Sequence, residues 1–430
     1  MRYFSTNRKS SHAGFKTAAL RGQPSDMGLY FPEQIPKTDW NRLRTLEKEE
    51  IAFEVIRPYT GDAFDDETLF RICSETVNFD FPLVKIDQRI STLELFHGAT
   101  LAFKDVGARF MSRCLQHFTK ESNDRTLVIV ATSGDTGGAV ANGFYGVEGV
   151  DVVILFPKDK VSKIQELQLT TPGDNITAIE IDGTFDECQK LAKTALADED
   201  LKKAFFVTSA NSINIARWLP QQFYYFYALQ QWNEDEPPVI CVPSGNFGNI
   251  CAGILAHISG LPAKKLIAAT NSNDVIPRYI QSGKLEPKRS VSTLSNAMDV
   301  GDPSNFVRIL EIFERDFGQL KTVLDSKSVS DGETAETIRS VYKETGYLLD
   351  PHGAVGYSVL ADHLNENEGD KGFFLETAHP IKFDSVETII GGKIDMPESV
   401  RGLFSRTGIA VEMDFDYECL KEFLLDIPGN

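Results

Sequence analysis

The sequence predicts an α/β protein built from two open, mostly parallel α/β subdomains and a small N-terminal domain. From about residue 126, apolar β-branched runs alternate with stretches of helical periodicity, and a second such series begins near residue 238. Alternation at this spacing indicates parallel strands, because a parallel pair needs a long, right-handed crossover. The turn-rich pattern before about residue 80 differs from both series, which indicates a separate small domain.

The predicted N-terminal domain opens with turn-forming residues that lead to Gly28-Leu29-Tyr30-Phe31-Pro32. Short, charged helical stretches follow near 40–57 and 66–76, and residues 78–86 form the passage into the core. The predicted division is residues 1–80 for the N-terminal domain, 81–385 for a core of two α/β subdomains and 386–430 for a C-terminal segment.

Each predicted strand of the core is a short apolar run bounded by turn residues. In the first series the strands are Thr126–Ala131, Val150–Phe156, Ile176–Ile181 and Ala204–Thr208, with helices at 137–145, 161–170 and 185–197 between them. In the second series the strands are Pro238–Val242, Lys265–Thr270 and Gly372–Glu376. Open sheets of this type bind ligands beyond the carboxyl ends of their strands, so the loops there are candidate sites.

Composition limits the classes of partner. The 430 residues carry a formal net charge of −18, and 42% of them are hydrophobic, enough for two or three domains with cores. An acidic surface repels polyanions, so we expect neither nucleic acid nor an anionic membrane as a partner. An anionic small molecule must then be held by local donors. We expect a small-molecule substrate and predict no protein partner.

Cysteine and histidine usage indicates a cytoplasmic protein without a metal site. The six cysteines show no CxxC spacing, which is typical of reduced, packed thiols. The seven histidines show no metal-ligand spacing either. No apolar run reaches membrane-spanning length, and the first residues lack the apolar core of a signal peptide.

One lysine is the leading candidate for catalysis. Lys104 ends the apolar run Leu101-Ala102-Phe103 and precedes residues that recur at helical spacing. These residues mark one buried helix face, namely Val106, Phe110, Met111, Leu115 and Phe118. A lysine at the mouth of such a helix is expected to be partly desolvated, which lowers the pKa of its amine and makes it a nucleophile. The alternative is a lysine that snorkels to the surface.

Two glycine-rich loops follow predicted strands and open predicted helices. The first contains Ser133, Gly134, Asp135 and Thr136, and the second contains Gly245, Asn246, Phe247, Gly248 and Asn249. Glycine lets backbone amides approach a ligand, and a helix N-terminus adds partial positive charge, so both loops are candidate anion sites. Each could instead be a tight strand-to-helix connection. Neither fits the dinucleotide-binding or the P-loop fingerprint.

Two further segments lie at predicted strand ends. The segment 209–217 offers Ser209, Asn211, Asn214 and Arg217 to a charged substrate. An N-capped helix with a surface arginine fits the same pattern. Thr377 directly follows the last predicted strand. Histidines near these loops are placed below Lys104, because such residues are more often structural hydrogen bonders; they are His97, His352 and His379.

Taken together, these segments resemble the threonine synthase family, which consists of pyridoxal-phosphate (PLP) enzymes of the tryptophan-synthase-β kind, fold type II. The resemblance covers most of the chain, except for about the last 40 residues. Its motifs are long and occur in the family's order, which makes them specific. The motifs are Gly28–Pro32, Leu95–Asp105, Ala131–Gly138, Ser209–Arg217, Ser244–Gly248, Leu294–Asp299 and Thr377–Pro380.

The resemblance implies PLP as cofactor and a role for each motif. Lys104 matches the family's Schiff-base lysine, and Thr377 matches the hydroxyl that hydrogen-bonds the pyridine nitrogen. The loop that cradles the cofactor phosphate is matched by Gly245, Asn246, Phe247, Gly248 and Asn249. At Asn249 some relatives have aspartate, and an amide can still donate to phosphate. The segments 133–136 and 211–217 match regions that hold the substrate's carboxylate and phosphate.

The implied reaction converts O-phospho-L-homoserine and water into L-threonine and phosphate, the last step of threonine biosynthesis. The cofactor acts as an electron sink, and Lys104 acts as the base. A related PLP lyase that eliminates phosphate and releases 2-oxobutanoate is the nearest alternative. A serine or threonine dehydratase is more distant, because it needs no phosphate site. A non-catalytic relative that binds phosphate metabolites is the alternative from another class.

Overall fold

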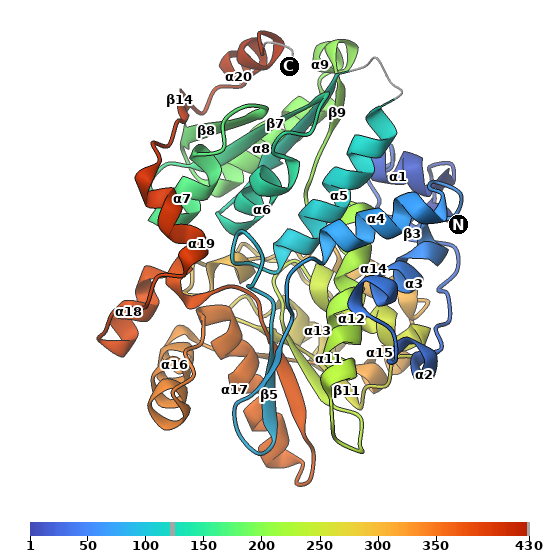
Figure 1. The fold of residues 1–430 in the computed structure, drawn as a ribbon, viewed down its shortest axis with the longest axis vertical. Coiled ribbons are helices and arrows are strands. Elements are labelled where there is room, and N and C mark those ends of the chain that lie inside the picture. Colours follow the sequence, from blue (N-terminus) through green and yellow to red (C-terminus); the bar gives the residue numbers. More distant parts are fainter. Residues whose placement is uncertain (121–124, 428–430) are drawn as a thin grey trace.

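The computed structural model describes residues 1–120 and 125–427, and these residues form three sheets. A six-stranded and a five-stranded sheet make up two α/β subdomains, and a three-stranded antiparallel sheet lies near the N-terminus. In Figure 1 the five-stranded sheet lies at the top and the N-terminal helices lie at the right. The predicted α/β class with two mostly parallel sheets is confirmed.

The five-stranded sheet has the strand order β14-β8-β7-β6-β9, and every adjacent pair is parallel. Its strands are β6 (Thr126–Ala131), β7 (Val150–Pro157), β8 (Ile176–Asp182), β9 (Phe206–Thr208) and β14 (Val411–Asp414). The helices around it are α6 (Asp135–Phe144), α7 (Lys163–Thr170), α8 (Phe185–Ala197), α9 (Glu199–Ala204) and α20 (Tyr417–Leu425).

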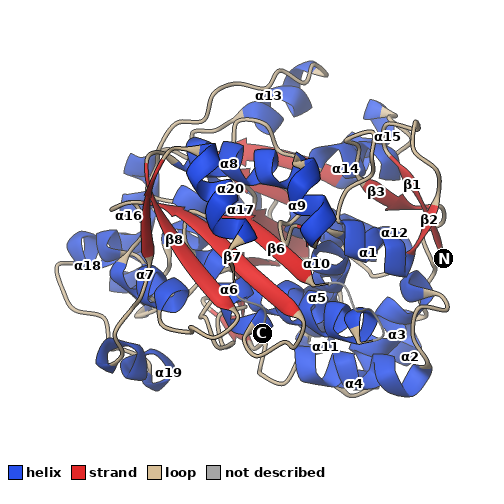
Figure 2. Cartoon of the chain, turned by 90° about the horizontal axis from the view of Figure 1, so that it is seen from above, coloured by secondary structure: helices blue, strands red, loops and turns tan. Residues whose placement is uncertain are grey.

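Helices cover both faces of this sheet, so β6 is buried at every position. Figure 2 looks down on α8, α9 and α20, which lie over one face. Leu127 and Ile129 pack in the same cluster as the buried residues of α8 and α20. Val128 and Val130, which alternate with them, pack instead with residues of α6. Burial on both faces explains why this strand reads as a continuous apolar run.

The six-stranded sheet has the order β12-β11-β10-β13-β5-β4 and is parallel except for the edge pair β4–β5. Its strands are β4 (Leu83–Lys85), β5 (Ile90–Glu94), β10 (Val239–Pro243), β11 (Lys265–Thr270), β12 (Leu324–Ser328) and β13 (Gly372–Glu376). The longer helices of this subdomain are α11 (Phe223–Gln231), α12 (Gly248–Ser259), α13 (Val275–Ser282), α16 (Asp331–Thr345) and α17 (Pro351–Glu366). Shorter ones are α10 (Ile215–Trp218), η1 (Leu219–Gln222), η2 (Asn296–Met298), α14 (Phe306–Ile312), α15 (Phe317–Val323), η3 (Pro380–Lys382) and α18 (Asp384–Ile390). Helix α5 (Lys104–Thr119) follows β5 and packs against α6 of the other subdomain.

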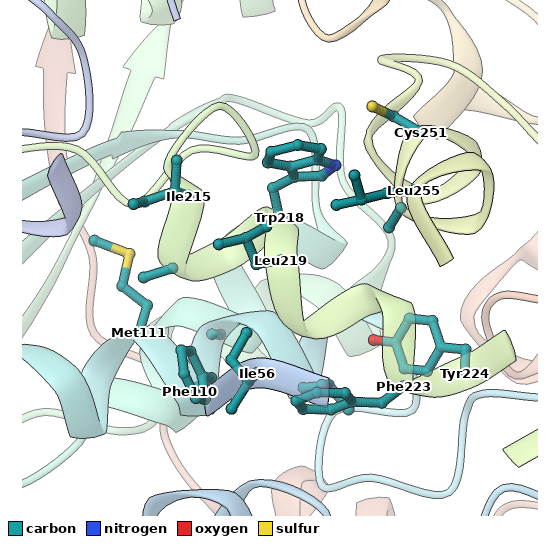
Figure 3. Close-up of a cluster of buried hydrophobic side chains, with 14 of the residues drawn as sticks. Ile56, Phe110, Met111, Ile215, Trp218, Leu219, Phe223, Tyr224, Cys251 and Leu255 are labelled. Atoms are coloured by element: carbon teal, nitrogen blue, oxygen red, sulfur yellow. The ribbon is translucent and has the colours of Figure 1, made fainter. Parts of the chain in front are cut away.

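The N-terminal region packs against the core and shares its hydrophobic cluster. Its elements are β1 (Arg2–Ser5), β2 (Ala13–Gly14), α1 (Phe15–Arg21), β3 (Tyr30–Pro32), α2 (Trp40–Leu43), α3 (Lys48–Thr60) and α4 (Asp66–Thr76). Figure 3 shows Ile56 of α3 beside Phe110 of α5 and Phe223 of α11. These helices therefore support α5, which carries the predicted catalytic lysine, from the outside.

The C-terminal segment crosses from one subdomain to the other. It leaves the six-stranded subdomain through α18, passes α19 (Glu398–Arg401) and η4 (Gly402–Ser405), and enters the five-stranded sheet as β14. On the way, the amide of Ile409 donates to the carbonyl of Thr170 at 2.8 Å. The boundaries at residues 80 and 386 stay predictions. No helix in the described ranges is long and apolar enough to cross a membrane.

Some predicted elements were wrong in their bounds. The strand expected from residue 204 begins at Phe206, because Asp198 caps a short helix, α9, that extends to Ala204. The helix expected from residue 137 begins at Asp135. Seven of the described strands were not predicted at all, namely β4, β5, β12 and β14 of the two larger sheets and β1, β2 and β3 of the N-terminal sheet.

Candidate active site

Main-chain pairing places Lys104 next to Thr377. The amide of Phe103 donates to the carbonyl of Thr377 at 2.9 Å, and the amide of His379 donates to the carbonyl of Leu101 at 3.0 Å. The segment before α5 is thus paired with the segment that follows β13. Leu101 has a left-handed φ of 57°, and just after this bend the chain enters α5, whose first residue is Lys104.

Lys104 is half-buried, so its amine is partly removed from solvent. Burial lowers the pKa of Lys104 to about 8; the Asp135 carboxylate opposes the shift, and the cationic Arg217 and Lys382 add to it. Within residues 1–120 and 125–427 the Lys104 amine has no hydrogen-bond or ion-pair partner. An unpaired amine with a lowered pKa is suited to act as a nucleophile and as a base.

The predicted loop before α12 makes such close contacts that one position requires glycine. A Cβ at Gly245 would lie 2.7 Å from Cα of Met298. Asn246 donates from Nδ2 to Oγ of Ser212 at 2.7 Å, which joins two of the predicted site segments. Phe247 has a left-handed φ of 61° and turns the chain into α12. The first amides of that helix have no intrahelical acceptor, so they are available to an anion.

Asn249 contributes a buried donor without a partner to the same loop. The hydroxyl of Tyr225 donates to Oδ1 of Asn249 at 2.8 Å. This bond fixes the orientation of the side chain, and Nδ2 is left buried with no acceptor. A buried donor without a partner costs free energy, so a ligand that accepts from it is expected.

The first glycine-rich loop is organised by a residue that precedes it. Oγ1 of Thr132 accepts from the amide of Gly134 at 3.0 Å and from that of Gly137 at 2.8 Å. This hydroxyl thereby starts α6 two residues earlier than the sequence predicts. The amides of Asp135 and Thr136 lie in the first turn and lack intrahelical acceptors, so the loop keeps donors for an anion.

The carboxylate of Asp135 already has two partners within the protein. Nζ of Lys382 lies 2.8 Å from Oδ1 of Asp135, and Nε2 of Gln165 donates to the same oxygen at 2.9 Å. Burial would raise the pKa of Asp135, but Lys382 and Lys104 outweigh it and hold that pKa well below its usual value. Sequence reasoning missed Lys382, which is fully buried. Its only local signal is its position between two apolar residues shortly after Thr377.

Arg217 is buried rather than on the surface, so the surface-arginine alternative is wrong. Its Nη1 donates to the carbonyl of Ala210 at 2.5 Å, and its Nε is buried without a partner. Burial lowers the pKa of Arg217 to about 10. The hydroxyl of Ser209 is also buried and unpartnered. The segment therefore holds a cation and a hydroxyl that an anionic ligand could satisfy.

The side chains of the two asparagines in this segment differ in their hydrogen bonding. Oδ1 of Asn214 accepts from the amide of Ala216 at 2.9 Å, and its Nδ2 donates to the carbonyl of Ala19 at 2.8 Å. Asn214 thus caps α10 and connects this segment to α1 of the N-terminal region. The side chain of Asn211 is half-buried and makes no hydrogen bond within the described ranges.

Thr377 lies next to a buried acidic network. Its hydroxyl has no partner in the described part of the chain, and Thr377 is 6% exposed. Glu376 accepts from the amide of Asp350 at 2.5 Å, and burial together with Asp350 raises the pKa of Glu376 well above its usual value. Asp350 also caps α17 by accepting from the amide of His352 at 2.6 Å.

The other histidines make structural contacts. Nε2 of His97 lies 2.7 Å from Oε2 of Glu94. Nδ1 of His379 accepts from the amide of Ile381 at 3.1 Å, and burial lowers the pKa of His379 to about 4. No group of three or more metal-ligating side chains is gathered in residues 1–120 and 125–427.

Three family models match the chain. The pyridoxal-phosphate dependent enzyme model matches residues 87–374. The threonine synthase N terminus model matches residues 2–77, and the threonine synthase C-terminal model matches residues 353–424. The chain belongs to the threonine synthase family. The C-terminal match includes most of the last 40 residues, where the sequence showed no recognisable motif.

Threonine synthases with high similarity share the whole length of the chain. The enzyme of Haemophilus influenzae is 42% identical over 99% of this chain and 100% of its own. The crystal structure of threonine synthase from Escherichia coli is 40% identical, covers 100% of both chains and has a TM-score of 0.93. The PLP-bound threonine synthase from Brucella melitensis is 34% identical, covers 99% of both chains and has a TM-score of 0.91.

These similarities confirm the predicted family, fold type II, the PLP-dependent lyase class and the small-molecule substrate class. The residues present also fit PLP. The aldehyde of this cofactor requires a free amine, which Lys104 supplies, and its phosphate requires donors, which the loop before α12 and Nδ2 of Asn249 supply.

Proposed function

We propose that this chain converts O-phospho-L-homoserine and water into L-threonine and inorganic phosphate, the last step of threonine biosynthesis. Membership of the threonine synthase family supports this reaction. The observation that carries it is the half-buried amine of Lys104, which has no hydrogen-bond or ion-pair partner in the described ranges and is held by main-chain pairing beside Thr377.

Three groups of residues would hold PLP. Lys104 would bind its aldehyde, the loop Gly245–Asn249 its phosphate, and the hydroxyl of Thr377 its ring nitrogen. Within the described ranges, neither the Thr377 hydroxyl nor Nδ2 of Asn249 has a hydrogen-bond partner, which supports these roles. When bound, PLP supplies an electron sink that stabilises negative charge at the substrate α-carbon.

Lys104 moves protons in the proposed reaction. With a pKa of about 8, the amine exchanges protons near neutral pH, which suits removal of the α-proton and its later return. Ser133 and the first-turn amides of α6 would bind the substrate carboxylate. Arg217 would bind the substrate phosphate, because its guanidinium is buried and has no carboxylate partner in the described ranges.

The product identifies the reaction. Purified enzyme is incubated with O-phospho-L-homoserine in heavy-oxygen water, and the organic product is analysed by mass spectrometry. We expect threonine with one heavy oxygen in its hydroxyl and an equal amount of phosphate. If 2-oxobutanoate is the main product at saturating substrate, the enzyme is the related lyase and not a threonine synthase. If the protein binds the substrate without turning it over, the protein is a non-catalytic relative.

We also propose a cytoplasmic location. Five of the six cysteines are buried as free thiols, and the sixth, Cys419, is an exposed free thiol, which is the state expected in a reducing compartment. Cell fractionation with compartment markers tests this, and recovery with an extracytoplasmic marker would contradict it.

A further inference from the structure

A second arginine is fully buried behind the cofactor-phosphate loop. Arg308, in α14, is 0% exposed. Its Nε and Nη2 donate to the carbonyl of Tyr30 at 3.1 and 3.0 Å, and Nη2 also donates to the carbonyl of Ile213 at 2.6 Å. Its Nη1 donates to Oδ1 of Asn305 at 2.7 Å. All these acceptors are neutral, and no carboxylate of residues 1–120 and 125–427 forms an ion pair with it.

A buried cation with only neutral partners is unusual. Moving an ion from water into the protein interior costs on the order of several kcal/mol unless an opposite charge compensates this cost. The ring of Trp218 lies 4.3 Å from the guanidinium and offsets part of this cost. Burial lowers the pKa of Arg308 only to about 10, so the group stays charged at neutral pH. Although the chain carries a net charge of −18, no carboxylate of the described residues forms an ion pair with this guanidinium.

Arg308 is separated from the loop by a single side chain. Asn305, which accepts from the guanidinium, donates from Nδ2 to the carbonyl of Asn246 at 3.1 Å. The neighbouring ring of Phe306 lies 5.7 Å from that of Phe247. The loop itself contains neither lysine nor arginine. The start of α14 therefore forms the wall behind the predicted phosphate site.

We propose that Arg308 is a positioning residue whose charge, acting through Asn305, attracts the cofactor phosphate, and that this phosphate is its counter-anion. The inference rests on the proposed function only in taking the loop Gly245–Asn249 as the phosphate site. It predicts a preference for ligands that carry a phosphate over otherwise identical ligands that do not.

The test compares PLP with pyridoxal, which lacks the phosphate, as ligands of the apoenzyme. Dissociation constants are measured by fluorescence for the wild type, Arg308→Gln and Arg308→Lys. Arg308→Gln should weaken PLP binding about ten- to a hundredfold and leave pyridoxal binding unchanged, since only the phosphate feels the lost charge. Arg308→Lys keeps the charge and should lie between. Equal losses for both ligands would show a merely structural role and overturn the proposal.

A second pair of variants keeps Arg308 in place. Asn305→Asp loses the Nδ2 donor to Asn246 but sets a carboxylate against the guanidinium and neutralises it, whereas Asn305→Ala removes both hydrogen bonds without adding charge. We expect Asn305→Asp to weaken PLP binding more than Asn305→Ala does, with no such difference for pyridoxal. Equal effects of the two variants overturn the proposal. If the wild-type apoenzyme itself fails to bind PLP, the proposed function fails as well.

Discussion

Nζ of Lys382 lies 2.8 Å from Oδ1 of Asp135, and both side chains are buried. Lys382 follows the six-stranded sheet and Asp135 opens a helix of the five-stranded sheet, so this ion pair joins the two subdomains. Lys382 also donates to the carbonyl of Thr100 at 2.7 Å, only four residues before Lys104. Because the charges of Asp135 and Lys382 both act on the pKa of Lys104, this ion pair and the Lys104 amine are coupled.

Removing one partner of this pair should destabilise the protein. Lys382→Met leaves the Asp135 carboxylate buried without a cation, which costs about 3–5 kcal/mol. The double variant Lys382→Met with Asp135→Leu removes both charges and should recover much of that loss. Denaturant unfolding of the four proteins of this cycle is the measurement. Losses that simply add would show that the two groups do not interact.

The sequence predicted local features of the site and not the contacts between distant ones. Strands such as β6 and β7 were recognised because both faces are buried, whereas β12 is an edge strand with alternating exposure and shows no apolar run. Lys104 and both loops carry their signals in adjacent residues. Lys382 and Arg308 do not, because their role depends on partners brought near by the fold.

The reactivity of Lys104 should follow its lowered pKa. The neutral amine is the reactive form, so the rate at which apoenzyme binds PLP covalently should rise with pH through about 8. Stopped-flow absorbance measures this rate. Lys382→Met removes a repulsive cation and should shift the inflection to higher pH. Borohydride reduction and peptide mapping should label Lys104, and a label on another lysine would disprove its role.

Loss of Arg217 should affect the substrate and not the cofactor. Charge-assisted hydrogen bonds are worth about 1.5–3 kcal/mol, so Arg217→Ala should raise KM for O-phospho-L-homoserine about ten- to a hundredfold. PLP affinity should be unchanged. Arg339→Ala, at an arginine on the exposed surface of α16, is the control. Unchanged kinetics of Arg217→Ala would remove Arg217 from the substrate site.

Glu376 should make the stability of the protein depend on pH. Burial, and then the charge of Asp350, raise the pKa of its carboxyl, with Glu94 adding to the shift, so the folded protein keeps the proton that the unfolded chain releases. The stability from this proton is fully present below the unfolded pKa of about 4.3. As the pH rises from there toward the folded pKa, it is lost at up to about 1.4 kcal/mol per pH unit.

Glu376→Gln tests this relationship, because glutamine resembles the protonated side chain and cannot ionise. Its amide can donate to Asp350 while its oxygen accepts from the Asp350 amide. Unfolding free energies are therefore measured for both proteins from mildly acidic to mildly alkaline pH. The variant should gain stability relative to the wild type as the pH rises. Glu366→Gln, at an exposed position of α17, should show no such trend. A pH-independent difference between wild type and Glu376→Gln would mean that Glu376 is ionised in the folded protein.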